Sequence, residues 1–568
     1  MLYSLVLNNL KFYKKKNYYF LNKLLERKYK KKNINYKTFN YKNINFKSRE
    51  KINKKIYLIS ERLIEELSII LNEIHETKFS KRSWKIIIGP WINYFVTICW
   101  NRFYKIKKVL KNPNLDSTVI FECPKNFLAL ENNLHMFKLC NNDDWNSILY
   151  SQILLFLRPD QKYKKIILKK NFENSFVKKS FIKIFLSKLL NFFKKDTDAL
   201  IVGSYLPFKE MLWLHFYLKQ LPQLYSYTNY EKSFLSRKNL REKIILNEKR
   251  TNNFEIFLAR IIPVYFPKCH LENFSSLKKQ VYNYHFPKNP KFIFTSNNYE
   301  FDEIFKLFTA IQIKKKTKYI IGQHGNISWI ENQFFNKIYA ADYYLNWGKD
   351  GFGRHQDGFN FKLTNHQFSY DKSGPILILD SPFGSNNKIY DRIEQNFIKE
   401  DLLYELLNLL KKQSITNIVI KLHSSSRQRD VNYVANLKSS YPNLAIVNND
   451  KKIFSLMKEA RCVIHTYDST GILESMSLNI PTFCIWPYGL SHVQRKFHRF
   501  YLNLKKNKIL YFSSIKMVET ISNHYQHLDK WWLSKKNSKE IFLKKFSIYP
   551  AKDSTKRLAN KLIDLSKS

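Results

Sequence analysis

The stretch CVIHTYDSTGILESMSLNIPTFCIWP, residues 462–487, decides the fold class of this chain. Residues 462–464 form a short apolar run typical of a buried parallel strand. Residues 472–478 predict a helix, which Pro481 ends before a second strand at 482–486. A helix that starts beside hydroxyl groups at the carboxyl end of a strand is suited to bind phosphate. Two interpretations remain open: a site for a nucleotide-activated donor, or an ordinary βαβ unit with a well-capped helix.

The same alternation of short apolar strands and helices fills the last third of the chain, which predicts a doubly wound parallel sheet. Its other expected strands are residues 376–379, 417–422, 444–447 and 509–512, and its helices 394–412, 428–439, 452–460 and 491–504. Earlier elements are spaced less regularly. The expected strands there are 117–123, 165–168, 199–202, 292–295, 318–321 and 343–347, with helices at 60–74 and 300–312.

We therefore predict an α/β protein with two Rossmann-like, doubly wound domains facing a cleft. The expected parts are a basic N-terminal segment without regular structure (1–53), an α/β acceptor domain (54–370), a donor-nucleotide domain (371–520) and a helical tail (521–568). Trp531 and Trp532 are expected to pack the tail back across both domains. Residues 84–100, with a corner expected at Gly89-Pro90, are predicted to be a core element rather than a membrane span.

The chain has 568 residues and a formal net charge of +51, which alone would suggest nucleic acid or anionic membrane as a partner. Because the lysines are spread along the whole sequence, we expect no nucleic-acid partner. The densest basic runs, 14–16 and 27–32, predict either a solvated arm or peripheral contact with an anionic membrane. Six single cysteines without paired spacing favour a reducing compartment. A cytoplasmic protein is expected, with contact at the inner face of the membrane left open.

A second candidate site follows the strand at 318–321, in the sequence Gly322-Gln323-His324-Gly325. The glycines allow close backbone approach to a ligand, and the imidazole can serve as general base for an acceptor hydroxyl. Glu331 is an orienting partner or an alternative base. Residues expected to contact the acceptor are Gln323 and Gly325 in this loop, and Ser204 and Tyr205 at the end of the strand 199–202.

The donor is expected to bind two loops of the second domain. After the strand at 417–422 come groups suited to a diphosphate: Lys421, His423, Ser424 and Arg427. In the opening stretch the expected phosphate ligands are Asp468, Ser469, Thr470 and Gly471, and Glu474 is placed to accept bonds from ribose hydroxyls. Each of these assignments has a competing interpretation. The loop after the strand at 417–422 is a capped loop with exposed polar residues, Asp468 is the N-cap of the helix, and Glu474 is a carboxylate on the helix surface.

Several common catalytic motifs are missing from the sequence: HExxH, GxSxG, GxxxxGK[ST] and GxGxxG. Their absence argues against metalloprotease, α/β-hydrolase, P-loop NTPase and simple dehydrogenase chemistry. No DxD-type pair stands out as a metal site. We therefore expect a metal-independent mechanism with no cofactor beyond the nucleotide-activated donor itself.

These segments resemble a transferase family found in bacterial surface-carbohydrate (O-antigen type) gene clusters. The stretches that carry the resemblance are residues 71–103, 320–328, 340–348 and 466–487 and the Trp531-Trp532 pair. More distantly, the layout is similar to GT-B glycosyltransferases and to polymer transferases that use nucleotide-activated glycerol phosphate or an acidic sugar. Those enzymes share a His-Gly loop, a Lys-x-His loop and a Ser-rich turn, which His324, His423 and Ser469-Thr470 match. The chain departs from the pattern at Asn326, where a second glycine is usual, and at Ser424, where proline is usual.

The resemblance implies a GT-B-like transferase of surface-polysaccharide synthesis, which moves a sugar from a nucleotide-sugar to a saccharide or lipid-linked acceptor. Transfer of a polyol phosphate from a CDP-glycerol-type donor is an alternative, and the residues do not separate the two. A third alternative is a non-catalytic carbohydrate-binding or assembly protein on a transferase fold. A chain without His324 and the Ser-Thr turn would favour this alternative, but this chain contains both features.

Overall fold

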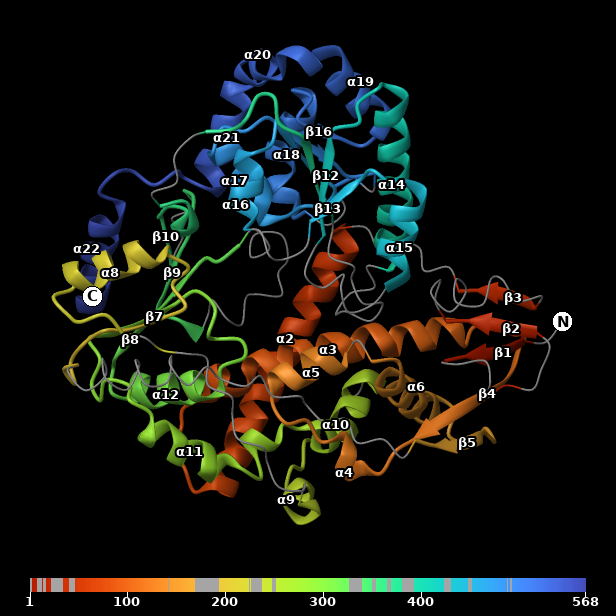
Figure 1. Cartoon of the computed structure of the whole chain (residues 1–568). Helices are drawn as coiled ribbons and strands as arrows, with labels where there is room; N and C mark the ends of the chain where they lie inside the picture. Colours follow the sequence, from red (N-terminus) through yellow and green to blue (C-terminus); the bar gives the residue numbers. More distant parts are fainter. Residues whose placement is uncertain are drawn as a thin grey trace.

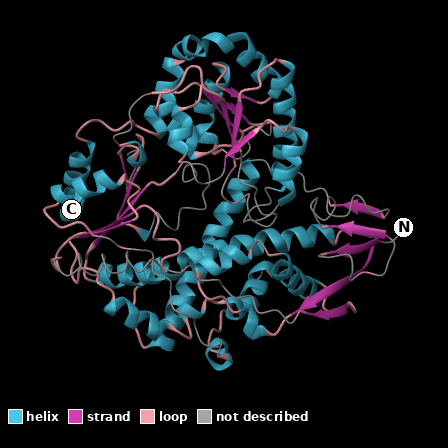
Figure 2. Ribbon diagram, in the orientation of Figure 1, coloured by secondary structure: helices cyan, strands magenta, loops and turns pink. Residues whose placement is uncertain are grey.

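The computed structural model describes residues 3–7, 13, 17–21, 34–39, 46–140, 142–168, 194–223, 225, 237–247, 252–325, 340–349, 354–364, 369–380, 393–422, 431–447, 452–487, 489–490 and 493–568. Its strands form three sheets in which every pairing is parallel. Figures 1 and 2 show them as three separate groups of strands, each accompanied by helices. The predicted α/β class with parallel sheets is confirmed.

The first sheet contains strands from the N-terminal segment, in the order β3-β2-β1-β4-β5. Its strands are β1 (Tyr3–Val6), β2 (Asn17–Phe20), β3 (Asn35–Thr38), β4 (Leu115–Glu122) and β5 (Lys164–Ile167). The expectation of no regular structure in residues 1–53 is therefore wrong. β1 to β3 have four residues each, and polar residues interrupt the apolar pattern of β2 and β3. β1 pairs with β4, which is remote in sequence, so tertiary contacts decide the conformation. The lysine runs at 14–16 and 27–32 lie outside the described residues.

Two long helices, α2 (Phe46–His75) and α3 (Lys81–Val109), cross the middle of the molecule (Figure 1). α3 is buried along nearly its whole length and packs against α2, α6 (Asp143–Leu157) and α12 (Glu303–Lys314). A helix that is apolar on all sides belongs in a core, so the core assignment of residues 84–100 is confirmed. Pro90 lies inside α3, so the corner expected at Gly89-Pro90 is wrong. Among the described residues, no helix combines the length and apolarity that crossing a membrane requires.

The second sheet has the order β10-β9-β8-β7-β6. Its strands are β6 (Leu200–Val202), β7 (Phe292–Thr295), β8 (Lys318–Gly322), β9 (Tyr343–Leu345) and β10 (His355–Gln356). The remaining helices of this part of the chain are α4 (Lys125–Leu128), α5 (Asn133–Leu139), α8 (Phe208–Tyr217), α9 (Lys238–Glu242), α10 (Asn253–Tyr265) and α11 (Phe274–Asn283).

The third sheet has the order β13-β12-β11-β14-β15-β16, which is that of a doubly wound fold. Its strands are β11 (Ile376–Leu379), β12 (Ile418–Lys421), β13 (Ala445–Val447), β14 (Cys462–His465), β15 (Thr482–Ile485) and β16 (Leu510–Tyr511). The helices around it are α14 (Ile393–Lys412), α15 (Val431–Ser440), α16 (Ile453–Lys458), α17 (Thr470–Ser477), α18 (His498–Lys506) and α19 (Ser514–His524). The strand order reverses between β11 and β14, where such folds bind their ligands.

The C-terminal tail packs on both the second and the third sheet through α20 (Leu528–Leu533), α21 (Lys536–Phe546) and α22 (Ser554–Lys567). Trp531 stacks on Phe483 of β15 with ring centroids 4.5 Å apart. Beyond α21, the Ile548 amide donates to the Trp347 carbonyl at 2.7 Å, just after β9. α22 then packs beside α8 (Figure 1). The expected packing of the tail across both halves is confirmed.

Candidate functional site

The turn between β14 and α17 lies at the point where the strand order reverses. Ser469 is the N-cap residue of α17, but its hydroxyl does not cap the helix and instead lies 3.3 Å from His465 Nδ1. The other ring nitrogen of His465 lies 3.0 Å from Ser475 Oγ. Burial lowers the pKa of His465 to about 3, so the ring is neutral at pH 7. A neutral, fully buried imidazole therefore fixes the start of α17.

The residues around this turn are placed by close packing. A Cβ at Gly471 would lie 3.0 Å from His465 Cε1, so glycine leaves room for the ring. Asp468 accepts a hydrogen bond from the Tyr501 hydroxyl at 3.1 Å, and since Ser469 holds the N-cap position, the alternative interpretation of Asp468 as the N-cap is wrong. Thr470 is the first residue of α17, and its side chain lies on the side of the helix that meets the second sheet.

The loop after β8 is fixed by a buried glutamine. The Gln323 side chain donates to the Gly325 carbonyl at 3.1 Å and accepts from the Trp347 amide at 2.8 Å. Its own amide donates to the Leu345 carbonyl of β9. Gln323, expected to contact the acceptor, is thus fully buried and holds the loop that carries His324.

His324 is partly buried between two tyrosines. The Tyr205 ring stacks on it with centroids 5.6 Å apart and an interplanar angle of 26°. The Tyr299 hydroxyl lies 3.5 Å from His324 Nδ1, at the outer limit of a hydrogen bond. Tyr205 has a positive φ of 63°, a conformation that costs energy in a bulky residue and is concentrated at functional sites. Ser204 is buried beside it, and its carbonyl accepts from Ser296 Oγ at 3.3 Å.

The two candidate loops meet. A Cβ at Gly325 would lie 2.8 Å from Thr470 Oγ1, so the His324 loop rests directly on the first residue of α17. Both loops follow the carboxyl ends of parallel strands, β8 and β14. The structure therefore brings the expected acceptor loop and the expected donor loop together at one junction between the second and third sheets.

A cation links the same two sheets. Lys362, in the short 3₁₀ turn Phe361–Leu363, places Nζ 3.6 Å from Glu474 Oε1 on α17. The same ammonium lies 5.1 Å from the centroid of the Tyr205 ring and 5.6 Å from that of Trp347. Burial raises the pKa of Glu474, and Lys362 opposes that rise. Glu474 is buried, so its interpretation as a helix-surface carboxylate is wrong.

Lys362, Tyr299 and Asp380 are site residues that the sequence did not reveal. Lys362 and Tyr299 belong to no recognisable pattern, and their role depends on tertiary contacts. Asp380 is buried directly after β11, at the reversal of strand order. The apolar run at 376–379 followed by a carboxylate was a usable signal for it. Its amide donates to the carbonyl of Lys421, the last residue of β12, which lies one strand from the reversal. The expected contact of Lys421 with phosphate stays a prediction.

Four predicted site residues lie outside the described residues: Glu331, His423, Ser424 and Arg427. Their roles stay predictions.

A family model described as "LIC12162 family transferase" matches residues 4–562. The chain belongs to the LIC12162 transferase family. No curated protein matches this family member in sequence.

Solved structures similar to this LIC12162 transferase share little sequence with it. They include TarM (12% identity, TM-score 0.30, 49% of this chain and 54% of TarM). A second is a UDP-GlcNAc 2-epimerase from Neisseria meningitidis bound to UDP-GlcNAc (13% identity, TM-score 0.34, 51% of this chain and 80% of the epimerase). A third is the wall teichoic acid polymerase TagF (13% identity, TM-score 0.31, 52% of this chain and 85% of TagF). The match thus spans about half of TarM.

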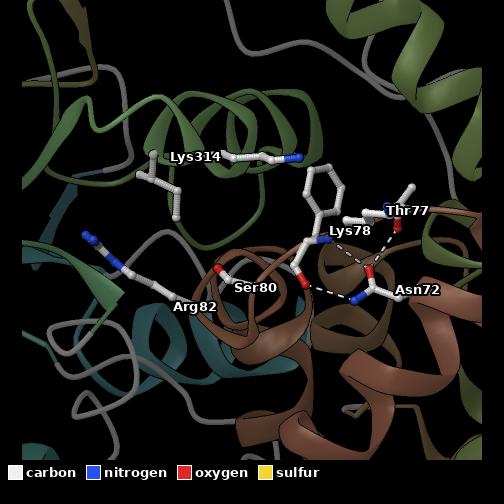
Figure 3. Close-up of a pocket in the computed structure, with 8 residues that line it drawn as sticks. Asn72, Thr77, Lys78, Ser80, Arg82 and Lys314 are labelled. Atoms are coloured by element: carbon white, nitrogen blue, oxygen red, sulfur yellow. Dashed lines mark hydrogen bonds between the residues drawn. The ribbon is translucent and has the colours of Figure 1, made fainter.

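A cavity of about 660 Å³ lies between the turn that joins α2 to α3 and the C-terminal end of α12 (Figure 3). Arg82 on its rim pairs with Asp342 at 2.8 Å, next to the amino end of β9, whereas His324 follows the carboxyl end of β8. Ligands of parallel α/β sheets bind at the carboxyl edge, so we do not assign this cavity to the transferase site.

Among the described residues, one cluster of side chains has the composition of a metal site. Ligand atoms of Cys269, His270 and Glu303 lie within 4.8 Å of one another, all buried. Lys306 Nζ, however, lies 2.7 Å from Glu303 Oε2. Burial alone would raise the pKa of Glu303, but Lys306 and His270 outweigh it and lower that pKa to about 2. The carboxylate is thus already neutralised by a buried ammonium, and the cluster is best understood as an internal ion pair.

Proposed function

We propose that this LIC12162 transferase moves a sugar from a nucleotide-activated donor to a hydroxyl of a saccharide or lipid-linked acceptor in surface-polysaccharide synthesis. The proposed mechanism needs neither a metal ion nor a further cofactor. The observation that supports the proposal is the contact of Gly325 with Thr470, because it joins the loop that carries His324 to the first turn of α17.

The donor side is the N-terminal end of α17 at the reversal of strand order. Ser469 and Thr470 offer hydroxyls there, and Lys362 offers a positive charge within a largely buried setting. A diphosphate leaving group gains negative charge as the bond from sugar to phosphate breaks. A fixed cation stabilises that charge more strongly in a dry site than in water. When the Lys362 side chain turns toward the phosphate, the Glu474 carboxylate can accept hydrogen bonds from ribose hydroxyls.

The acceptor side is His324. In the proposed step His324 Nε2 takes the proton of the acceptor hydroxyl while its oxygen attacks the anomeric carbon. The bond from that carbon to the donor phosphate breaks, and the nucleoside diphosphate leaves with the electron pair. For Nε2 to be the free base, Nδ1 must carry a proton, and the Tyr299 oxygen is placed to accept it. Burial and the nearby Glu300 raise the pKa of Tyr299, so it stays a neutral phenol.

A thermal-shift screen with UDP-, GDP-, CMP- and dTDP-linked sugars and with CDP-glycerol tests the proposal. We expect one nucleotide-sugar to raise the Tm of the wild type, and Lys362→Met to reduce that rise. Lys372→Met is the matched control, since Lys372 pairs with Asp529 on an exposed surface. A response to CDP-glycerol alone would replace sugar transfer by polyol-phosphate transfer. No response to any nucleotide would contradict both.

The assignment of the base needs a separate variant. His324→Ala should keep the Tm rise with donor and lose turnover, because the base does not hold the nucleotide. Turnover that survives in this variant would show that another group takes the proton.

A further inference from the structure

Helix α8 presents apolar side chains to solvent as well as to the core. Leu214 is buried on its inner face, whereas Phe208, Trp213 and Phe216 are 63%, 50% and 65% exposed. Positions 208 and 216 are two turns apart, and 213 lies on the neighbouring flank, so the three side chains share one outer face. Leu221, 47% exposed, extends this face beyond the end of the helix. We call these four residues the α8 aromatic face.

Two of the aromatic rings of this face contact each other and the neighbouring Tyr217. Trp213 and Phe216 meet edge to face with centroids 5.5 Å apart, and Trp213 stacks on Tyr217 at 6.0 Å. Single exposed hydrophobic residues are common on soluble proteins, but a contiguous group of large rings marks an interaction surface.

Positive charge surrounds the α8 aromatic face. Lys209 and Lys219 are exposed at its two ends. α22 packs beside α8 and contacts it through Thr555 and Glu210. On α22, Lys556 and Lys567 are exposed as well. The whole chain carries a formal net charge of +51, so an anionic partner is favoured over a neutral or cationic one.

The α8 aromatic face adjoins the candidate site. α8 begins three residues after Tyr205, whose ring stacks on His324. Both β6, which precedes α8, and β8, which precedes His324, end at the same edge of the second sheet. The helix has 10 residues and is therefore about 15 Å long, so its outer face reaches from the site edge along the flank of the sheet.

We propose that the α8 aromatic face docks this protein on the surface of an anionic lipid bilayer. Large amphipathic rings settle at the boundary between headgroups and acyl chains, and flanking lysines are attracted to anionic headgroups. Docking brings His324 close to the bilayer, where the sugar of a lipid-linked acceptor is presented. The link to that acceptor rests on the proposed function, whereas the docking itself does not.

Vesicle co-sedimentation of the full chain tests this proposal. The probes are phosphatidylcholine vesicles with and without phosphatidylglycerol, at low and high salt. We expect binding to the anionic vesicles, weakened by salt, and a fall in the partition coefficient of about tenfold or more in Trp213→Ser/Phe216→Ser. Lys209→Glu/Lys556→Glu should weaken binding through charge alone, which separates docking from a folding defect. Leu533→Ser, 64% exposed on α20, is the control and should bind as the wild type does.

Three results would overturn the proposal. One is a wild type that stays in solution with both kinds of vesicle. Another is unchanged sedimentation of Trp213→Ser/Phe216→Ser. The third is self-association that depends on protein concentration and that this double variant abolishes, in a protein that does not bind vesicles. This result would assign the face to a second copy of the chain. The Tm rise with nucleotide, measured on the same variants, reports on the proposed function independently of vesicle binding.

Discussion

Gly325 and Thr470 lie so close that a Cβ on Gly325 would be 2.8 Å from the Thr470 hydroxyl. The contact joins the loop after β8 to the first turn of α17, and it leaves no room for a larger residue. Since Gly325 directly follows His324, this packing sets how near the imidazole stands to α17.

Gly325→Ala should reduce turnover by about tenfold or more, because displacing a catalytic group by a fraction of an ångström lowers the rate steeply. The Tm rise with nucleotide should decrease less than turnover, because Thr470 is the one proposed donor ligand that the new Cβ contacts. Steady-state kinetics and thermal shift together check this. In Gly325→Ala/Thr470→Ala the clash is relieved, so the double variant should lose less activity than the two single losses combined. Strict additivity would show that the contact does not position His324.

Lys362→Met should lower the free energy of unfolding by about 1–3 kcal/mol, because it leaves Glu474 buried without its partner. Urea denaturation at neutral pH measures this. Adding Glu474→Gln should recover part of the loss by removing the unpaired charge. If the single variant is as stable as the wild type, the two side chains do not interact in solution.

Tyr299→Phe should lower kcat about tenfold while the dissociation constant of the donor stays the same. Without the phenol, Nδ1 of His324 has lost the group that we propose to hold its proton. The same variant should shift the pH at which activity rises, which a purely structural effect would not do. An unchanged kcat and pH profile would remove Tyr299 from the mechanism.

His465 should make stability depend on pH. Its pKa is lowered from 6.5 to about 3 in the folded protein, so between these values the unfolded chain binds more protons than the folded one. The neutral ring therefore makes its full contribution to the free energy of unfolding above pH 6.5, and this contribution decreases as the pH falls toward 3. His465→Gln lacks this contribution. The stability difference between wild type and variant should be about 2 kcal/mol smaller at about pH 4.5 than at about pH 7. A constant difference in urea denaturation at both pH values would contradict the burial of a neutral ring.

Glu303→Gln should destabilise the fold by about 3–5 kcal/mol, because it leaves the buried Lys306 ammonium unpaired. Glu303→Gln/Lys306→Met removes both charges and should lose less than the single variant. Equal losses in the single and the double variant, measured by urea denaturation, would show that packing rather than charge holds this cluster.

The sequence predicted elements best where local pattern alone determines them. The strands β7 and β11 occupy the predicted residues, since each is a short apolar run between turn residues. The strand–turn–helix unit that begins at Cys462 is also as predicted. The sequence did not predict β1 to β3 because they are short and partly polar, and because β1 joins them to the sheet by pairing with β4, far away in the sequence. Pro90 was misjudged because its neighbours in space, not in sequence, keep α3 helical.

The candidate site was predictable residue by residue but not as an arrangement. His324 and Thr470 were each identified from a loop at a strand end. Their proximity follows from how two sheets pack, which no local pattern encodes. Lys362 lies between Phe361 and Leu363, two fully buried residues, and nothing in that short stretch marks it as the cation that reaches Glu474.

The packing of the tail has a consequence for the order of events during synthesis. The carbonyl of Trp347 and the amide of Asn360 hydrogen-bond to Ile548, and α22 covers α8. The second sheet can therefore reach its final packing only after some two hundred further residues have been made. Until then its flank, including apolar surface that α22 later covers, stays exposed. The half of the protein that carries His324 is thus completed by a segment that is translated long after its own strands.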